Sequence, residues 1–159
     1  MTILNRKKIE DIRKRGELWT AAGNYWLFGT CRYVDGSTVS KSRCIRDARL
    51  LFNNLDRRIL GRKLYRENIR LPRLVYMETG RWRVNTHIHF YIKGYEQKHC
   101  EEIWQMAENL WVELIEGAWD CVIKDNRTDG AARAGYCWKE FNDYGDETLL
   151  VDCCYIENT

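Results

Sequence analysis

The sequence has few of the features that mark linkers, membrane spans and exported proteins. Its single proline, Pro72, excludes a proline-rich linker, and no apolar run approaches the length of a membrane helix. The basic start, from Met1 to Arg15, lacks the apolar segment of a secretory signal. We therefore expect a protein with no membrane partner that works in the cytoplasm.

Paired cysteines of the Cys-x-x-Cys kind, which mark structural zinc sites, are also absent. The seven cysteines stand at other spacings, and only Cys153 and Cys154 are neighbours. An odd number of cysteines in an intracellular protein favours reduced, buried thiols over the alternative of a disulfide framework.

The chain does have enough apolar (45%) and aromatic (13%) residues for one compact domain spanning residues 1–159. Its charge is divided unevenly. Residues 1–73 carry 18 Lys and Arg against 7 Asp and Glu, whereas residues 74–159 carry 8 against 16. The basic half favours a polyanionic partner, and a set of solvated, arginine-rich helix faces is the alternative.

The spacing of apolar residues predicts a fold of mixed helices and antiparallel strands. Helical spacing occurs at 40–59, 96–116 and 131–142, and the basic residues 1–20 form either a helix or a mobile arm. Strand patterns occur at 25–33, 74–78, 81–93, 119–124 and 149–156. The predicted core includes Trp104, Trp111, Trp119 and Trp138. This order predicts an α+β fold with about five antiparallel strands, helices on one face and the other face open, in a ferredoxin-like or RRM-like arrangement.

The strand at 81–93 alternates strictly and has one polar face. Trp82, Val84, Thr86, Ile88, Phe90 and Ile92 share one parity, while Arg81, Arg83, Asn85, His87, His89, Tyr91 and Lys93 share the other. Because residues i and i+2 lie on one face, His87 and His89 can turn both imidazoles toward one metal ion. Glu78, at the end of the preceding strand, is a candidate third ligand. Surface hydrogen bonds and an ordinary strand end are the alternative interpretations.

The predicted helix at 131–142 carries Tyr136 and Lys139, which lie on one side because they are three residues apart. Tyr136 is one of nine tyrosines, so an ordinary packing role is the alternative. As a nucleophile, a phenol forms a phosphate ester that preserves bond energy for rejoining. A cation at Lys139 can offset the charge that builds on the phosphoryl oxygens.

A strand with His-hydrophobe-His, followed later by Tyr-x-x-Lys on a helix, resembles the HUH endonucleases, most closely the nuclease domain of rolling-circle replication initiators (Rep proteins). The resemblance covers nearly the whole chain. It implies a divalent ion, Mn²⁺ or Mg²⁺, held by Glu78, His87 and His89, with Tyr136 as nucleophile and Lys139 beside it. The implied activity is the nicking and joining of single-stranded or hairpin origin DNA through a 5′-phosphotyrosine.

Candidate DNA-binding residues come from the polar strand face and from the first strand. They are Thr30, Arg32, Arg81, Arg83, Asn85, Tyr91 and Lys93, with Tyr91 as a stacking ring for bases. Thr30 is included because Phe28-Gly29-Thr30 loosely matches the first motif of the family.

The chain has no Gly-x-x-x-x-Gly-Lys-Ser/Thr loop, so we expect no helicase domain. A host or separately encoded helicase and a polymerase are then the expected partners. A single candidate tyrosine leaves termination to a second subunit of a homo-oligomer, to water or to a second turnover.

The sequence also bears on three alternatives to a replication initiator. Small transposases of the same superfamily usually place a glutamine ligand a turn after the tyrosine, where this chain has Lys139 and Glu140. Relaxases carry a third histidine near the pair, and it is missing here. A non-enzymatic module that binds single-stranded nucleic acid on the open sheet is the alternative from another class.

Overall fold

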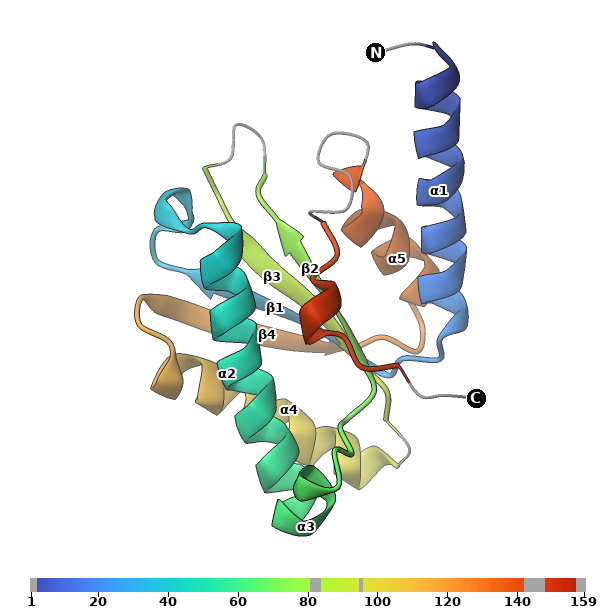
Figure 1. The fold of residues 1–159 in the computed structure, drawn as a ribbon. Coiled ribbons are helices and arrows are strands. Elements are labelled where there is room, and N and C mark those ends of the chain that lie inside the picture. Colours follow the sequence, from blue (N-terminus) through green and yellow to red (C-terminus); the bar gives the residue numbers. More distant parts are fainter. Residues whose placement is uncertain (1–2, 81–83, 95, 142–147, 157–159) are drawn as a thin grey trace.

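The computed structural model describes residues 3–80, 84–94, 96–141 and 148–156 (Figure 1). The helices are α1 (Ile3–Ala22), α2 (Lys41–Ile59), α3 (Gly61–Arg66), α4 (Gln97–Leu114) and α5 (Gly130–Trp138), and the short 3₁₀ helices are η1 (Gly36–Thr38) and η4 (Val151–Cys153). The strands are β1 (Leu27–Tyr33), β2 (Arg73–Glu78), β3 (His87–Ile92) and β4 (Ala118–Asp125). No helix in these ranges is both long and apolar enough to cross a membrane.

The expected α+β class is confirmed. Antiparallel strands form one sheet in the order β2-β3-β1-β4, and the chain order β1-α2-β2-β3-α4-β4 is that of ferredoxin-like folds. The sheet has four strands in the described residues rather than about five. The stretch 149–156, predicted as a strand, is η4 between two single bridges to β2, from Leu149 to Tyr76 and from Tyr155 to Arg73.

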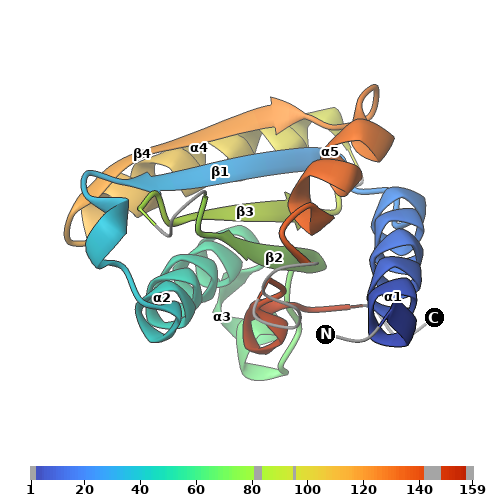
Figure 2. The same ribbon diagram turned by 90° about the horizontal axis from the view of Figure 1, so that it is seen from above.

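One face of the sheet is covered by α2 and α4 (Figure 2), and the main core lies between them. Ile88, Phe90 and Ile92 of β3 are buried there against apolar positions of both helices. The alternation predicted for this strand is therefore confirmed from His87 onward, although residues 84–86 are not part of it. Burial of these side chains orients the odd-numbered residues of β3 to the opposite face.

The opposite face is only partly open, because α5 packs on it with α1 at its back (Figure 2). A second apolar cluster forms there from Tyr25, Phe28, Leu74, Tyr76, Tyr91, Cys137 and Trp138. This packing fixes α5, which carries Tyr136, relative to the strands. The part of this face that lies over β1 and β4 carries exposed residues, among them Val122 and Lys124.

Close packing between α1 and Trp138 holds α5 in place. Gly16 of α1 faces the indole so closely that a β-carbon there would lie 2.5 Å from ring atoms. Thr20 accepts a hydrogen bond from Trp138 Nε1 at 3.0 Å and shares another with the Tyr76 hydroxyl at 2.8 Å. The basic N-terminal segment is thus a helix that supports the tyrosine helix.

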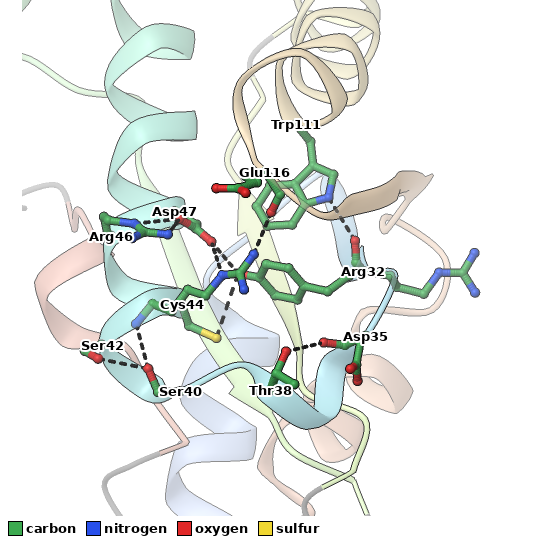
Figure 3. Close-up of polar contacts among 12 residues, drawn as sticks. Arg32, Asp35, Thr38, Ser40, Ser42, Cys44, Arg46, Asp47, Trp111 and Glu116 are labelled. Carbon is green, nitrogen blue, oxygen red and sulfur yellow. Dashed lines mark hydrogen bonds and ion pairs between the residues drawn. The ribbon is translucent and has the colours of Figure 1, made fainter.

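Polar contacts on the helix side of the sheet fix the end of β1 (Figure 3). The buried carboxylate of Asp47 accepts hydrogen bonds from Arg46 Nε at 3.0 Å and from Arg43 Nε at 3.4 Å. Trp111 Nε1 donates to the main-chain oxygen of Arg32 at 3.1 Å. The Arg32 side chain points away from Trp111 (Figure 3), so its guanidinium is available to the other face.

Three of the four tryptophans predicted in the core pack there, but Trp119 is 61% exposed. In a regular strand Trp119 would share the parity of the buried Cys121 and Ile123 and would face the core. A register shift breaks that parity, since Arg32 lies opposite Asp120 while Tyr33 lies opposite Ala118. Trp119 is the extra residue of this bulge, which turns its indole out of the core.

All seven cysteines are free thiols, and six of them are buried. The preference for reduced, buried thiols over a disulfide framework is confirmed. Burial also raises the pKa of the Cys137 thiol to about 12, which keeps it protonated on the packed side of α5.

The contact between Gly16 and Trp138 predicts opposite effects for two glycine substitutions. Gly16→Ala should lower the free energy of unfolding by about 1–2 kcal/mol, because the clash outweighs the gain in helix propensity. Gly135→Ala, at a position of α5 where an added β-carbon would meet open space, should instead raise it by about 0.5–1 kcal/mol. Urea unfolding followed by circular dichroism measures both, and equal effects would contradict the packing described.

Candidate metal centre and nucleophile

The hairpin of β2 and β3 brings Glu78 to the two histidines. Glu78, the last residue of β2, lies directly opposite His87, the first residue of β3, and Tyr76 lies opposite His89. The apolar even-numbered residues of β3 are held against the helices, so His87 and His89 both face the other side. One carboxylate and two imidazoles therefore meet at one end of the hairpin.

Their ligand atoms lie close enough to share one ion. Glu78 Oε2 is 2.8 Å from His89 Nε2 and 3.2 Å from His87 Nε2, and all three side chains are buried. Neighbouring ligands of an octahedral ion at 2.0–2.1 Å stand about 3 Å apart, which both distances approach. The group could hold a metal ion, with all candidate ligand atoms within 4.8 Å of one another.

The outer nitrogen of each imidazole has a partner that suits metal binding through Nε2. His87 Nδ1 lies 2.7 Å from the main-chain oxygen of Asn85, which can only accept, so Nδ1 carries a proton. In the neutral ring, Nε2 then presents a lone pair toward the Glu78 carboxylate. A metal ion between Nε2 and the carboxylate would be shared by both groups.

His89 is oriented by β1. Its Nδ1 lies 2.9 Å from the hydroxyl of Thr30, the residue opposite it in the sheet, and the ring of Phe28 stacks on it with centroids 5.3 Å apart. Because a hydroxyl can accept as well as donate, Thr30 permits the tautomer that leaves Nε2 free for a metal. Thr30, which was predicted to bind DNA, therefore orients the candidate ligand His89 and is only partly buried.

The second oxygen of Glu78 contacts α5. The Tyr136 hydroxyl donates to Glu78 Oε1 at 3.4 Å, and Lys139 Nζ lies 2.5 Å from the same atom. Lys139 Nζ also lies 3.5 Å from the centroid of the Tyr136 ring. Tyr136 is 44% exposed, so its phenol can meet a substrate from solvent while the imidazoles remain buried. The five residues proposed from the sequence as metal ligands, nucleophile and cation are therefore brought together around one carboxylate.

Charges in this cluster are mutually stabilised. Burial alone would raise the pKa of Glu78, but in the site without a metal ion the hydrogen bonds that His87, His89 and Lys139 donate to it outweigh burial and hold the pKa well below its usual range. Burial lowers the pKa of His89, which favours the neutral ring that a metal requires. For Lys139, the contacts with Glu78 and Tyr136 outweigh burial and raise the pKa.

Glu140 is a residue of this region whose role the sequence did not reveal. Its Oε2 accepts from the Thr79 main-chain nitrogen at 2.9 Å and from the Thr79 hydroxyl at 3.2 Å, and its Oε1 accepts from the Gly80 nitrogen at 2.9 Å. The buried carboxylate thereby ties the end of the tyrosine helix to the turn after β2. No spacing or parity signal marks this contact, because it joins distant parts of the chain.

The structure does not bring the candidate DNA-binding residues together on one exposed surface. Tyr91 cannot stack on bases as expected, because it is completely buried beneath α5 and its hydroxyl points to Cys137 Sγ at 3.6 Å. Arg32 is half exposed and paired with Asp120. The polar parity of β3 predicted exposure for Tyr91, and the packing of α5 over that parity overturns the prediction.

The other candidates are spread along the strand. Asn85 is exposed just before β3 and near the histidines, whereas Lys93 follows the last residue of β3 at its far end. Arg81 and Arg83 lie outside the described residues.

The arrangement combines a buried three-ligand group with an accessible phenol and a cation. A bound ion at such a group would have open positions for phosphate oxygens, since only three protein ligands surround it. Comparison with protein-family models, curated proteins and solved structures found no match for this chain.

The three hydrogen bonds to Glu140 predict that Glu140→Gln destabilises the protein. The amide group would set an N–H donor against a main-chain N–H, at a cost of about 1–3 kcal/mol in the free energy of unfolding. Glu113→Gln, which changes an exposed carboxylate 3.9 Å from Arg58, should alter it by less than about 0.5 kcal/mol. Chemical unfolding measures both, and a Glu140 effect no larger than the Glu113 effect would contradict the proposed clamp.

Proposed function

We propose that this protein is an HUH-type endonuclease that nicks and rejoins single-stranded DNA through a covalent link to Tyr136. The nick would initiate rolling-circle replication of a plasmid, phage or virus. The preferred ion would be Mn²⁺ or Mg²⁺, held by Glu78, His87 and His89.

One observation carries the proposal: the two oxygens of Glu78 face the two halves of the reaction. Oε2 lies against both imidazoles, and Oε1 lies against the Tyr136 hydroxyl and the Lys139 ammonium. An ion at the imidazoles would therefore sit next to the phenol. A phosphate drawn to that ion comes within reach of the nucleophile, as in-line attack requires.

The chemical step exchanges one phosphodiester for another. The Tyr136 oxygen forms a bond to the scissile phosphorus while the bond to the 3′ oxygen breaks. Tyr136 gives up its proton and the departing 3′ oxygen gains one, so no net charge is created. The product is a 5′-phosphotyrosine and a free 3′-hydroxyl, and the reverse reaction rejoins the strand.

Lys139 contributes fixed positive charge at the reacting oxygens. Its ammonium lies over the Tyr136 ring and beside Glu78, where it can offset negative charge on the phosphoryl group. The bound divalent ion would supply Lewis-acid polarisation of the phosphate. Burial of the ligands limits water at the imidazoles and leaves the phenol side open to DNA.

Two features of the structure support the replication initiator over the alternatives. Glu140, at the position next to Lys139, is engaged with the main chain at Thr79 and Gly80, which does not fit the glutamine ligand of the small transposases. A non-enzymatic binding module has no need of the phenol and the ammonium that meet at Glu78 beside the two imidazoles.

The expected partners follow from the same proposal. The substrate would be single-stranded or hairpin origin DNA, and a helicase and polymerase would come from the host or from a separate gene. Since α5 offers one tyrosine, completing a replication cycle would need a second copy of the chain, water or a second turnover.

The decisive assay is formation of a covalent adduct. With Mn²⁺ and a random-sequence pool of single-stranded oligonucleotides, the protein should gain an adduct that migrates slowly on a denaturing gel. Tyr136→Phe should remove it completely, because the phenolic oxygen is the nucleophile, while Tyr65→Phe, on α3, should retain it. An adduct that persists in Tyr136→Phe would exclude Tyr136, and an adduct that forms in excess chelator would exclude the ion.

Metal binding is measurable without DNA. Mn²⁺ at about a hundred times its dissociation constant should stabilise the protein by about 2.7 kcal/mol, an increase of about 5–10 °C in the midpoint of thermal unfolding. His87→Ala should abolish this increase by removing a ligand, whatever its effect on the midpoint without metal. His99→Ala, which changes the histidine outside the site, should keep it. If Mn²⁺ raised the midpoint equally in His87→Ala and His99→Ala, the ion would be bound elsewhere.

A further inference from the structure

The edge strand β4 presents an exposed tryptophan close to the candidate metal centre. Trp119 is the extra residue of the bulge opposite Arg32 and Tyr33, and 61% of its surface is exposed. A bulge that turns a large apolar ring into solvent costs burial that a core position would have provided. The exposed ring is available to stack on a ligand.

A planar cation already lies on this ring. The Arg32 guanidinium is 5.0 Å from the centroid of Trp119, and Asp120 fixes it through Nε at 2.7 Å and through Nη2. Asp120 uses two of the five N–H groups of the guanidinium, which leaves three for another acceptor. The pair thus combines an exposed aromatic ring with phosphate-binding donors that lie over it.

A surface hollow of about 240 Å³ extends from Arg32 to the residues that support His89. It is lined by Phe28, Thr30, Arg32, Val122 and Lys124. Thr30 also holds His89 and Phe28 stacks on it, so the hollow begins beside the candidate metal ligands. The charges of Arg32 and Asp120 offset each other, so Lys124 gives the hollow one net positive charge.

We propose that Trp119 and Arg32 form a base-binding subsite for single-stranded DNA. The inference depends on the proposed function. The strand would pass from Tyr136 over β1, with its phosphates near Lys124 and Arg32, and one base would stack on Trp119. Neighbouring strands are about 4.8 Å apart, so β4 lies about 10 Å from the strand of the histidines, a span that a short run of nucleotides covers.

The chemistry of the subsite specifies an unpaired base. A ring of this kind binds the face of a base, and a base within a duplex has its faces covered by its neighbours. Stacking on tryptophan tolerates any base, so the subsite positions the strand rather than reading its sequence. Tyr91, expected to provide this stacking, is replaced in that role by a residue on the edge strand.

The test is DNA binding by variants at Trp119 in the full-length Tyr136→Phe protein, which cannot form the adduct. With a labelled oligonucleotide of mixed sequence and Mn²⁺, fluorescence anisotropy should show about five- to hundredfold weaker binding for Trp119→Ala. Trp119→Phe should recover most of the affinity. Trp19→Ala, which removes an exposed tryptophan from α1, should bind as the parent protein does.

A second measurement separates stacking from a structural effect. A single defined oligonucleotide is made in a series, each member with one abasic position. For one member of the series, the parent protein should bind as weakly as Trp119→Ala binds the intact oligonucleotide. At that position the losses in binding free energy from the abasic site and from Trp119→Ala should not add, because both changes remove the same stacked pair. Unchanged affinity in Trp119→Ala, additive losses at every abasic position, or no binding of single-stranded DNA by the parent would each overturn the subsite.

These outcomes are distinct from those of the adduct assay. Binding that depends on Trp119 without any Tyr136 adduct in the wild-type protein would uphold the subsite and refute the nicking function. An adduct that forms while DNA binding is independent of Trp119 would uphold the nicking function and refute the subsite.

Discussion

The carboxylate of Glu78 is the point on which the candidate site depends. Within the described part of the chain, it is the group that touches both imidazoles of β3, the hydroxyl of Tyr136 on α5 and the ammonium of Lys139 just after that helix. A carboxylate buried among these partners is favourable only because each of them offers a proton or a positive charge. Loss of that carboxylate would leave two imidazoles and an ammonium facing one another with no negative charge between them.

Elements on both faces of the sheet position the residues that contact Glu78. On one side, α2 and α4 bury the even-numbered residues of β3 and so orient the histidines. On the other, α1 and Trp138 seat the tyrosine helix, while Glu140 ties its end to the turn after β2. The phenol is thereby fixed beside the histidines before any substrate binds, which reduces the entropy lost on reaching a reactive geometry.

The parts of this site that the sequence predicted are those that depend on local periodicity. The parity of His87 and His89 and the hairpin that sets Glu78 opposite His87 follow from side chains alternating along strands. The helical spacing of Tyr136 and Lys139 placed both on one side of α5. These patterns, with the order of elements, were sufficient to predict the α+β class and the residues that surround Glu78.

The parts that the sequence did not predict depend on contacts between distant segments. Burial of Tyr91 results from the packing of α5, and exposure of Trp119 results from a register shift between β1 and β4. The stretch predicted as a fifth strand touches β2 at two bridges and turns as η4 between them, with Leu150 and Cys153 directed into the core. Neither an alternating pattern nor a propensity encodes these outcomes, because each is decided by tertiary packing.

The central claim is that one cation is shared by Glu78, His87 and His89 within reach of the Tyr136 hydroxyl. The most direct measurement is X-ray diffraction at the manganese absorption edge from crystals grown with MnCl₂. The account predicts one anomalous peak within coordination distance of Glu78 and of Nε2 of both histidines, on the side of α5. A peak bound by other residues, or crystals in which these three side chains bind no manganese, would contradict it.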